Sequence, residues 1–246
     1  MEPSSVTERI GGEFSLHARS YLCKVRETRG LGEAVRATIA LGLQTLVLAK
    51  VAIICRGSSR VRFFQSGTDF MDNAIALGAR SGDWCEFGVF QGKSLRYIAS
   101  RTTETVHGFD SFQGLSESWA GLKKGTFSTA GKLPEAPSNV VFHVGYFDES
   151  VPQYLRSAGP IAFVHIDSDL YASAVTVLRG IRSHLRPGSI MVFDELVGAF
   201  HNDELSALRD ELVVKGVQIE WIGFYLSPGW GVSASLRVVS GTGISD

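Results

Sequence analysis

Acidic residues stand at the ends of several strand-like segments, with a spacing that would assemble a charged site. Glu86 ends one segment, Asp110 ends the next, and Asp167, Asp194 and Glu195 close two later ones. In open α/β sheets a ligand binds beyond the carboxyl ends of the strands, so these side chains should meet at one edge. Several carboxylates at one place repel each other unless protons or a cation neutralise them.

Asp167, Asp194 and Glu195 are the residues that we expect to bind a metal ion, because their two strands should be neighbours. Hard oxygen ligands, with no Cys and no clustered His, favour Mg²⁺ over Zn²⁺. Such an ion would bind a hydroxyl group of the substrate and lower the pKa of that hydroxyl. His201 opens the following helix near this edge and is a candidate general base. Asp169 is expected to cap the helix that begins just after it.

The segment 86–94, Glu-Phe-Gly-Val-Phe-Gln-Gly-Lys-Ser, passes from a strand end through a glycine turn into a helix. A phosphate-binding loop needs four residues between its first Gly and Gly-Lys-Ser, but only three separate Gly88 from Gly92. The dinucleotide fingerprint G-x-G-x-x-G is absent as well. Both nucleotide-binding motifs are therefore matched only in part. A P-loop-like nucleotide-binding enzyme is kept as an alternative, and so is a tight turn that binds no ligand.

Charge indicates which ligand this turn would bind. Glu86 would repel a phosphate and attract an ammonium or hydroxyl group. Asp110 lies 22 residues beyond Gly88, where an acidic residue suits the two hydroxyls of a ribose. A ligand with a ribose, an amino group and a positive charge is S-adenosylmethionine. We expect Gly88, Gly92 and Ser94 to form the turn that binds it.

Alternating strand-like and helix-like segments predict an α/β fold. The expected strands are 83–88, 105–110, 139–144, 161–167 and 189–194, and the expected helices are 68–79, 92–102, 171–185 and 202–215. Two more strands, 218–225 and 233–239, flank a turn that leaves no room for a helix and predict an antiparallel hairpin. The sequence therefore predicts a doubly wound, mostly parallel seven-stranded sheet with a C-terminal antiparallel hairpin. The long segment 111–137 fits neither helix nor strand, and loops of this length are usually functional.

The composition excludes several other classes of protein. The chain has 246 residues, 44% of them hydrophobic, which excludes a disordered protein. The net charge of -1 gives no reason to expect a nucleic-acid partner. The three scattered cysteines predict neither a disulfide framework nor a zinc site, and with no signal-peptide pattern they indicate the cytoplasm. The apolar stretch 34–55 carries Lys50, so we expect a buried or dimer-forming helix rather than a membrane span.

Four motifs in order resemble the macrocin O-methyltransferase family of class I methyltransferases. They are residues 86–94, 108–115, 165–171 and 192–195. The resemblance implies methylation of a hydroxyl on a sugar or glycosylated natural product, with S-adenosylmethionine and usually Mg²⁺. A methyltransferase-like domain that binds without turnover is the remaining alternative.

The resemblance also implies roles for individual residues. Glu86 and Gly88 would hold the methionine part of the cofactor, Asp110 and Ser111 its ribose, and the turn 145–147 its adenine. That turn consists of Gly145, Tyr146 and Phe147. Asp167, Asp194 and Glu195 take the metal positions, with Asp167 also a candidate base; relatives can carry a second aspartate where this chain has Glu195. Residues 68–246 would form the methyltransferase domain and residues 1–67 a helical extension for a lid or dimer contacts, so we expect a homo-oligomer.

Overall fold

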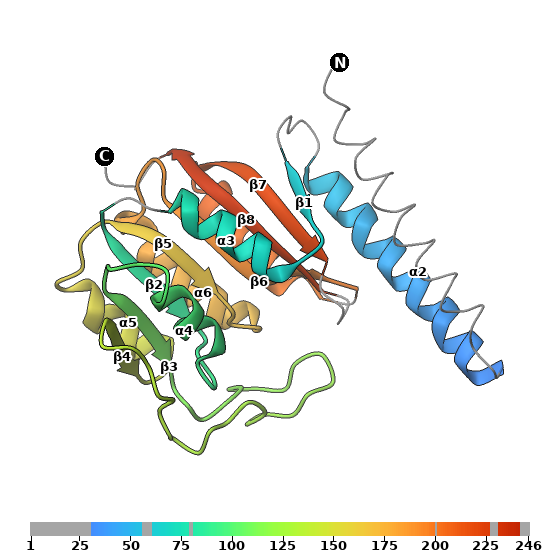
Figure 1. The fold of residues 1–246 in the computed structure, drawn as a ribbon, viewed down its shortest axis with the longest axis horizontal. Helices are drawn as coiled ribbons and strands as arrows, with labels where there is room; N and C mark the ends of the chain where they lie inside the picture. The colour runs from blue at the N-terminus through green and yellow to red at the C-terminus, as the bar shows by residue number, and fades with distance from the viewer. Residues whose placement is uncertain (1–30, 56–60, 79–80, 200, 227–230, 242–246) are drawn as a thin grey trace.

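The fold is an eight-stranded sheet with helices on both faces (Figure 1). The computed structural model describes residues 31–55, 61–78, 81–199, 201–226 and 231–241. The strands are β1 (Arg62–Phe64), β2 (Asp83–Phe87), β3 (Val106–Asp110), β4 (Val140–Val144), β5 (Ile161–Ile166), β6 (Ile190–Gly198), β7 (Gln218–Leu226) and β8 (Gly231–Ser240). The helices are α2 (Leu31–Ile54), α3 (Gly67–Leu77), α4 (Lys93–Ala99), α5 (Phe147–Leu155), α6 (Tyr171–Ile181) and α7 (Asp203–Leu208).

The strand order β1-β7-β8-β6-β5-β2-β3-β4 confirms the predicted fold class. Among the described strands, only β8 runs antiparallel to both of its neighbours, and with β7 it forms the expected hairpin. The number of strands differs from the prediction, because β1 pairs in parallel with β7 at the sheet edge. This strand has three residues, too few to show an alternating pattern. It also precedes residue 68, so the sheet begins ahead of the predicted domain boundary.

Helix α5 was not predicted from the sequence. It follows β4 directly, and Pro152 inside it weakens the helical signal. It is nevertheless amphipathic, since Val151 and Tyr154 are buried against the sheet. Burial of this face, rather than the propensity of its residues, accounts for the helix.

Two layers of apolar side chains cover the two faces of the sheet. Consecutive residues of β2 point to opposite faces, so Trp84 packs in one cluster and Cys85 in the other. Helices α3 and α4 contribute to the first cluster, and helices α5, α6 and α7 to the second. The sheet is therefore buried on both sides, and its carboxyl edge remains the place for a ligand.

Helix α2 packs against the second cluster through its C-terminal half. Val47 and Val51 are buried there, as expected for a buried helix within 34–55, whereas Leu46 and Ile53 are exposed. Over the ranges that the structure describes, no helix is long and apolar enough to span a membrane. Residues 1–30 of the predicted extension lie outside the described residues, as does the turn of the hairpin.

The register of the central strands brings the predicted site residues to one edge. Glu86 of β2 is paired with His165 of β5, which is paired with Val192 of β6. Because side chains alternate along a strand, Gly88, Asp167 and Asp194 follow two residues later on the same face. The order β2-β5-β6 therefore assembles this edge from distant parts of the chain, since the paired residues Glu86 and His165 are 79 residues apart.

Candidate active site

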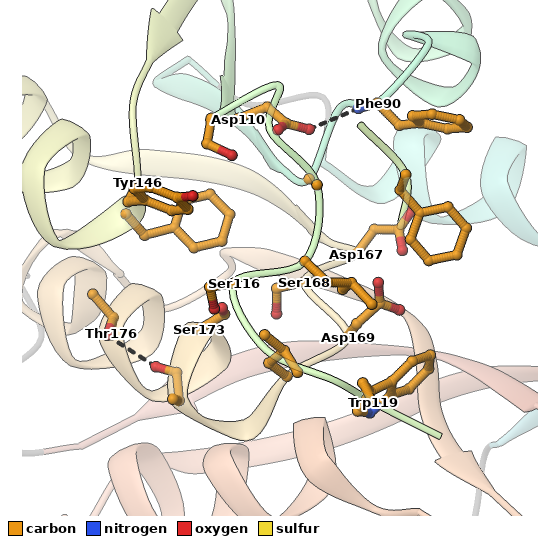
Figure 2. A pocket seen from close by; sticks show the side chains of 18 of the residues that line it. Phe90, Asp110, Ser116, Trp119, Tyr146, Asp167, Ser168, Asp169, Ser173 and Thr176 are labelled. Atoms are coloured by element: carbon orange, nitrogen blue, oxygen red, sulfur yellow. Dashed lines mark hydrogen bonds between the residues drawn. The ribbon is translucent and has the colours of Figure 1, made fainter. Parts of the chain in front are cut away.

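A cavity of about 800 Å³ opens at the carboxyl edge of the sheet (Figure 2). Ligand pockets range over roughly 300–1,000 Å³, so this cavity has the size of a small-molecule site. Its lining comes from the strand ends, from the first turns of α5 and α6 and from the long loop 111–137. Figure 2 shows Asp110 and Tyr146 toward one side of the cavity and Asp167, Asp169 and Trp119 toward the other.

Gly88 lines the cavity where β2 ends. Its φ is +95°, and a Cβ at this position would overlap the carbonyl oxygen of Asp167. The Asp167 N–H also donates to the Phe87 carbonyl at 2.8 Å. The turn after β2 therefore lies directly against the end of β5, and a residue without a Cβ is required there.

Four carboxylates line the cavity on the side of β5 and β6: Asp167, Asp169, Asp194 and Glu195. Burial, and after it the charge of Asp194, raises the pKa of Asp167 well above its ordinary value. Burial and the charge of Glu195 raise the pKa of Asp169 to about 7. Burial and Asp194 raise the pKa of Glu195 in the same direction. The predicted acidic edge is therefore assembled, with mutual repulsion among its members.

The donor chemistry of this edge suits a hard cation, but its geometry does not form a metal site. Among the residues with described positions, no group of three or more His, Cys, Asp or Glu side chains is placed to hold a metal ion. The structure therefore brings Asp167, Asp194 and Glu195 into one cavity without arranging them as ligands.

Asp110 organises the loops around the cavity. Its Oδ2 accepts hydrogen bonds from the N–H groups of Val89 at 2.8 Å and Phe90 at 2.7 Å. Its Oδ1 accepts one from the N–H of Phe112 at 2.7 Å. Phe90 and Phe112 both adopt positive φ, a conformation that is strained for a residue with a side chain. Asp110 lines the cavity, but most of its acceptor capacity stabilises these two turns.

We expect Asp110→Ala to lower both the stability of the protein and its affinity for S-adenosylhomocysteine. Three backbone N–H groups lose a charged acceptor, and the unfolding free energy should fall by about 2–3 kcal/mol. Denaturant unfolding and calorimetry would measure the two effects. Asp110→Asn is the control. It keeps the volume of the side chain, but its NH₂ group replaces one of the two oxygens and cannot accept a hydrogen bond from the backbone N–H groups that face it. Lost affinity with unchanged stability in both variants would show that Asp110 acts only on the ligand.

Glu86 differs from its predicted position, because it does not line the cavity. Its side chain is fully buried, and its Oε1 lies 2.7 Å from Nδ1 of His165. Within the part of the chain that the structure describes, Glu86 Oε2 and His165 Nε2 are buried without a hydrogen-bond partner. Although burial opposes it, the hydrogen bond and charge of Glu86 raise the pKa of His165 overall. This pair thus joins β2 to β5 inside the sheet, two residues before Gly88 and Asp167 along their strands.

Three other predicted residues also lie off the cavity wall. Gly92 precedes α4 as its N-cap with φ +72°, and a Cβ there would lie 2.9 Å from the Pro134 side chain, so Gly92 is a turn residue. Ser94 lies inside α4 and, like Gly92, is not part of the lining. His201 Nε2 is 3.7 Å from Glu195 Oε2, near the acidic edge but outside the lining.

The predicted adenine and ribose residues do line the cavity. Ser111, Gly145, Tyr146 and Phe147 all contribute to its wall. Asp148 and Glu149 in the first turn of α5 also contribute, and the sequence reading missed them together with that helix. The signal was present as two acidic residues after a strand, which is typical of a helix start.

Glu204 of α7 is a further residue that the sequence did not single out. It is 1% exposed, and its Oε1 accepts hydrogen bonds from the N–H of Ser168 at 3.1 Å and from the Ser168 hydroxyl at 3.4 Å. Ser168 joins Asp167 to Asp169, which has a positive φ of 58°. Glu204 therefore supports the turn that carries two of the cavity carboxylates.

Aromatic and apolar residues line the cavity from the long loop. Leu115, Trp119, Leu122 and Phe127 contribute there, and Phe127 packs edge-to-face on Phe90 with ring centroids 5.6 Å apart. The Trp119 indole N–H donates to Asp203 Oδ2 at 3.2 Å. The long loop 111–137 thus contributes an aromatic and apolar part of the cavity wall.

Comparisons with known proteins agree with this architecture. Residues 85–196 match the family model described as a methyltransferase domain. A comparison with curated proteins finds no match. The crystal structure of CalS11, a calicheamicin methyltransferase, is 23% identical, with a TM-score of 0.53 over 89% of this chain and 90% of that one.

Two further structures are similar to this chain. Apo CalS11, described as a TDP-rhamnose 3'-O-methyltransferase of calicheamicin biosynthesis, is 27% identical, with a TM-score of 0.50 over 69% of this chain and 78% of that one. The O-methyltransferase NovP is 17% identical, with a TM-score of 0.52 over 70% of this chain and 80% of that one. The chain therefore shares the fold of these methyltransferases, including the sheet order and the C-terminal hairpin, and its residues 85–196 match a methyltransferase domain.

Proposed function

We propose that this protein is an S-adenosylmethionine-dependent O-methyltransferase acting on a hydroxyl of a sugar or glycosylated natural product. The observation that carries the proposal is one cavity that joins the Gly88 turn to the carboxylates of Asp167 and Asp194. The match to a methyltransferase domain supports the cofactor. The names of CalS11 and NovP support oxygen as the methylated atom. The narrower resemblance to macrocin O-methyltransferases supports the class of acceptor.

Asp167 is the group that we propose as general base. Methyl transfer joins the acceptor oxygen to the methyl carbon, breaks the bond from that carbon to the sulfonium sulfur, and passes the hydroxyl proton to a base. Burial and nearby carboxylates raise the pKa of Asp167, and a carboxylate with a raised pKa is the stronger base near neutral pH. His201 is the weaker candidate because it does not line the cavity.

Mg²⁺ binding remains a proposal that rests on donor chemistry. Asp167, Asp194 and Glu195 offer the oxygen ligands that Mg²⁺ prefers, and a bound ion would polarise an acceptor hydroxyl. The described carboxylates are not grouped as a metal site, so no catalytic step is assigned to an ion. We also propose a homo-oligomer in the cytoplasm that binds no nucleic acid, on composition and resemblance alone.

Calorimetric titration with S-adenosylhomocysteine, with and without Mg²⁺, tests the cofactor. We expect a dissociation constant on the order of micromolar, near -8 kcal/mol. A panel of glycosides is then incubated with S-adenosylmethionine and analysed by mass spectrometry. The acceptor is the glycoside whose product is heavier by one CH₂ group. Absence of binding in both titrations would reject the methyltransferase proposal while leaving the fold unchanged. Binding of ATP instead would support the P-loop-like alternative.

A further inference from the structure

Lys50 connects helix α2 to the corner of the fold beside the cavity. Its ammonium group donates to the carbonyls of Gly198 at 2.9 Å and Ala199 at 3.3 Å, and to Asn202 Oδ1 at 3.0 Å. An ammonium group has three N–H donors, so these three contacts use all of them. They join the N-terminal helix to residues 198–203, here called the β6–α7 corner, of which residue 200 is not described.

The β6–α7 corner in turn supports a wall of the cavity. The Gly198 N–H donates to the His201 carbonyl at 3.0 Å, which closes the corner on itself. The Trp119 indole donates to Asp203, and its ring packs edge-to-face on His201 with centroids 4.8 Å apart. Trp119 belongs to the cavity lining, and Figure 2 shows it toward the same side of the cavity as Asp169.

These contacts form one chain of support from the N-terminal helix to the cavity. Helix α2 lies at the β1 end of the sheet and extends beyond it (Figure 1), so packing alone gives it no part in the cavity wall. Val51, the residue after Lys50 in helix α2, is buried in the core. The helix is thus fixed by its apolar face while Lys50 reaches the corner.

We propose that Lys50 is a positioning residue for the acceptor: it holds the β6–α7 corner, and the corner holds Trp119 against the bound acceptor. This inference rests on the proposed function for the identity of the acceptor. The contacts themselves predict a loop that depends on Lys50 whether or not an acceptor is known.

Hydrogen exchange of wild type and Lys50→Met, without ligand, tests the chain of contacts. Methionine keeps the apolar length of the side chain and removes its three donors. We expect exchange on the order of tenfold faster both in the β6–α7 corner and in residues 111–137, equivalent to one lost charge-assisted hydrogen bond. Strands β2 and β5 should be unchanged. Lys50→Arg, which keeps donors and charge, should restore most of the protection.

Arg237→Met is the matched control, because it removes the cation of the exposed pair with Glu220 on the hairpin and should leave both segments unchanged. Faster exchange in the corner alone, or an equal increase throughout the protein, would overturn the proposal. With an acceptor from the glycoside screen, Lys50→Met should raise the acceptor KM roughly tenfold, with kcat and the affinity for S-adenosylhomocysteine retained. If no glycoside is methylated, the proposed function fails, and the exchange data still decide the role of Lys50.

Discussion

Asp167→Asn should abolish most methyl transfer while leaving the binding of S-adenosylhomocysteine unchanged. The amide has the volume of the carboxylate, but it cannot take the proton of the substrate hydroxyl, and it has no negative charge with which to bind a cation. Loss of a general base lowers kcat by about 10²–10⁴-fold. Single-turnover assays with the acceptor from the screen would measure the rate, and calorimetry would measure the affinity. Glu104→Gln, which removes an exposed carboxylate before β3 at the opposite edge of the sheet, is the control for charge.

The same substitution should not destabilise the protein at neutral pH. Burial raises the pKa of Asp167 in the folded state, so the folded protein holds this proton more tightly than the unfolded chain. The stability that the protonated group contributes is complete below the ordinary pKa of 3.8 and is lost as pH rises through the raised value. The melting temperature of Asp167→Asn relative to wild type should therefore rise with pH across this window. A variant that is inactive and also less stable at pH 8 would contradict the assignment.

Addition of Mg²⁺ separates the two roles proposed for Asp167. An ion that binds the folded state raises the melting temperature according to its concentration relative to the dissociation constant. If Asp167 is a ligand, Mg²⁺ should stabilise wild type and not Asp167→Asn. If Mg²⁺ stabilises neither protein, the base assignment stands and the metal assignment is rejected.

The central part of the fold was predictable because its strands carry strong local signals. Segments such as 161–167 and 189–194 are short apolar runs closed by an acidic residue, and both became strands within a residue or two at their starts. The failures were β1 and α5, where the determining interaction is not local. β1 exists because β7 offers an edge to pair with, and α5 exists because Tyr154 and Val151 are buried under the sheet.

For the site, too, the sequence predicted where side chains lie but not which groups they contact. The sequence placed Asp167, Asp194 and Glu195 at one edge, because the carboxyl ends of parallel strands lie there and β6 pairs in parallel with β5 as far as Phe193. It did not show what each carboxylate would bind. Asp110 stabilises two loop turns, one of which begins 21 residues earlier in the chain, at Val89. Glu86 finds His165 across the neighbouring strand, which requires the register of β2 and β5 to be known.

Gly88→Ala should destabilise the protein strongly and abolish cofactor binding. A Cβ at Gly88 would overlap the backbone carbonyl of Asp167, and the φ of +95° is itself strained for alanine. Because the obstacle is backbone, β2 and β5 must separate at the edge where Asp167 stands. Strain and overpacking of this kind together cost about 3 kcal/mol or more. Denaturant unfolding would measure the loss, and titration with S-adenosylhomocysteine would measure the affinity.

Gly121→Ala separates the overlap from the backbone strain. Gly121 has a φ of +87°, close to that of Gly88, but no heavy atom lies within 4 Å of its added Cβ. This variant should therefore cost only the left-handed conformation, about 1–2 kcal/mol. The difference between the two alanine variants measures the contact of the β2 turn with the end of β5. Equal losses in both would mean that the two strand ends yield easily, and that Gly88 is required for its dihedral angle rather than for the approach of Asp167.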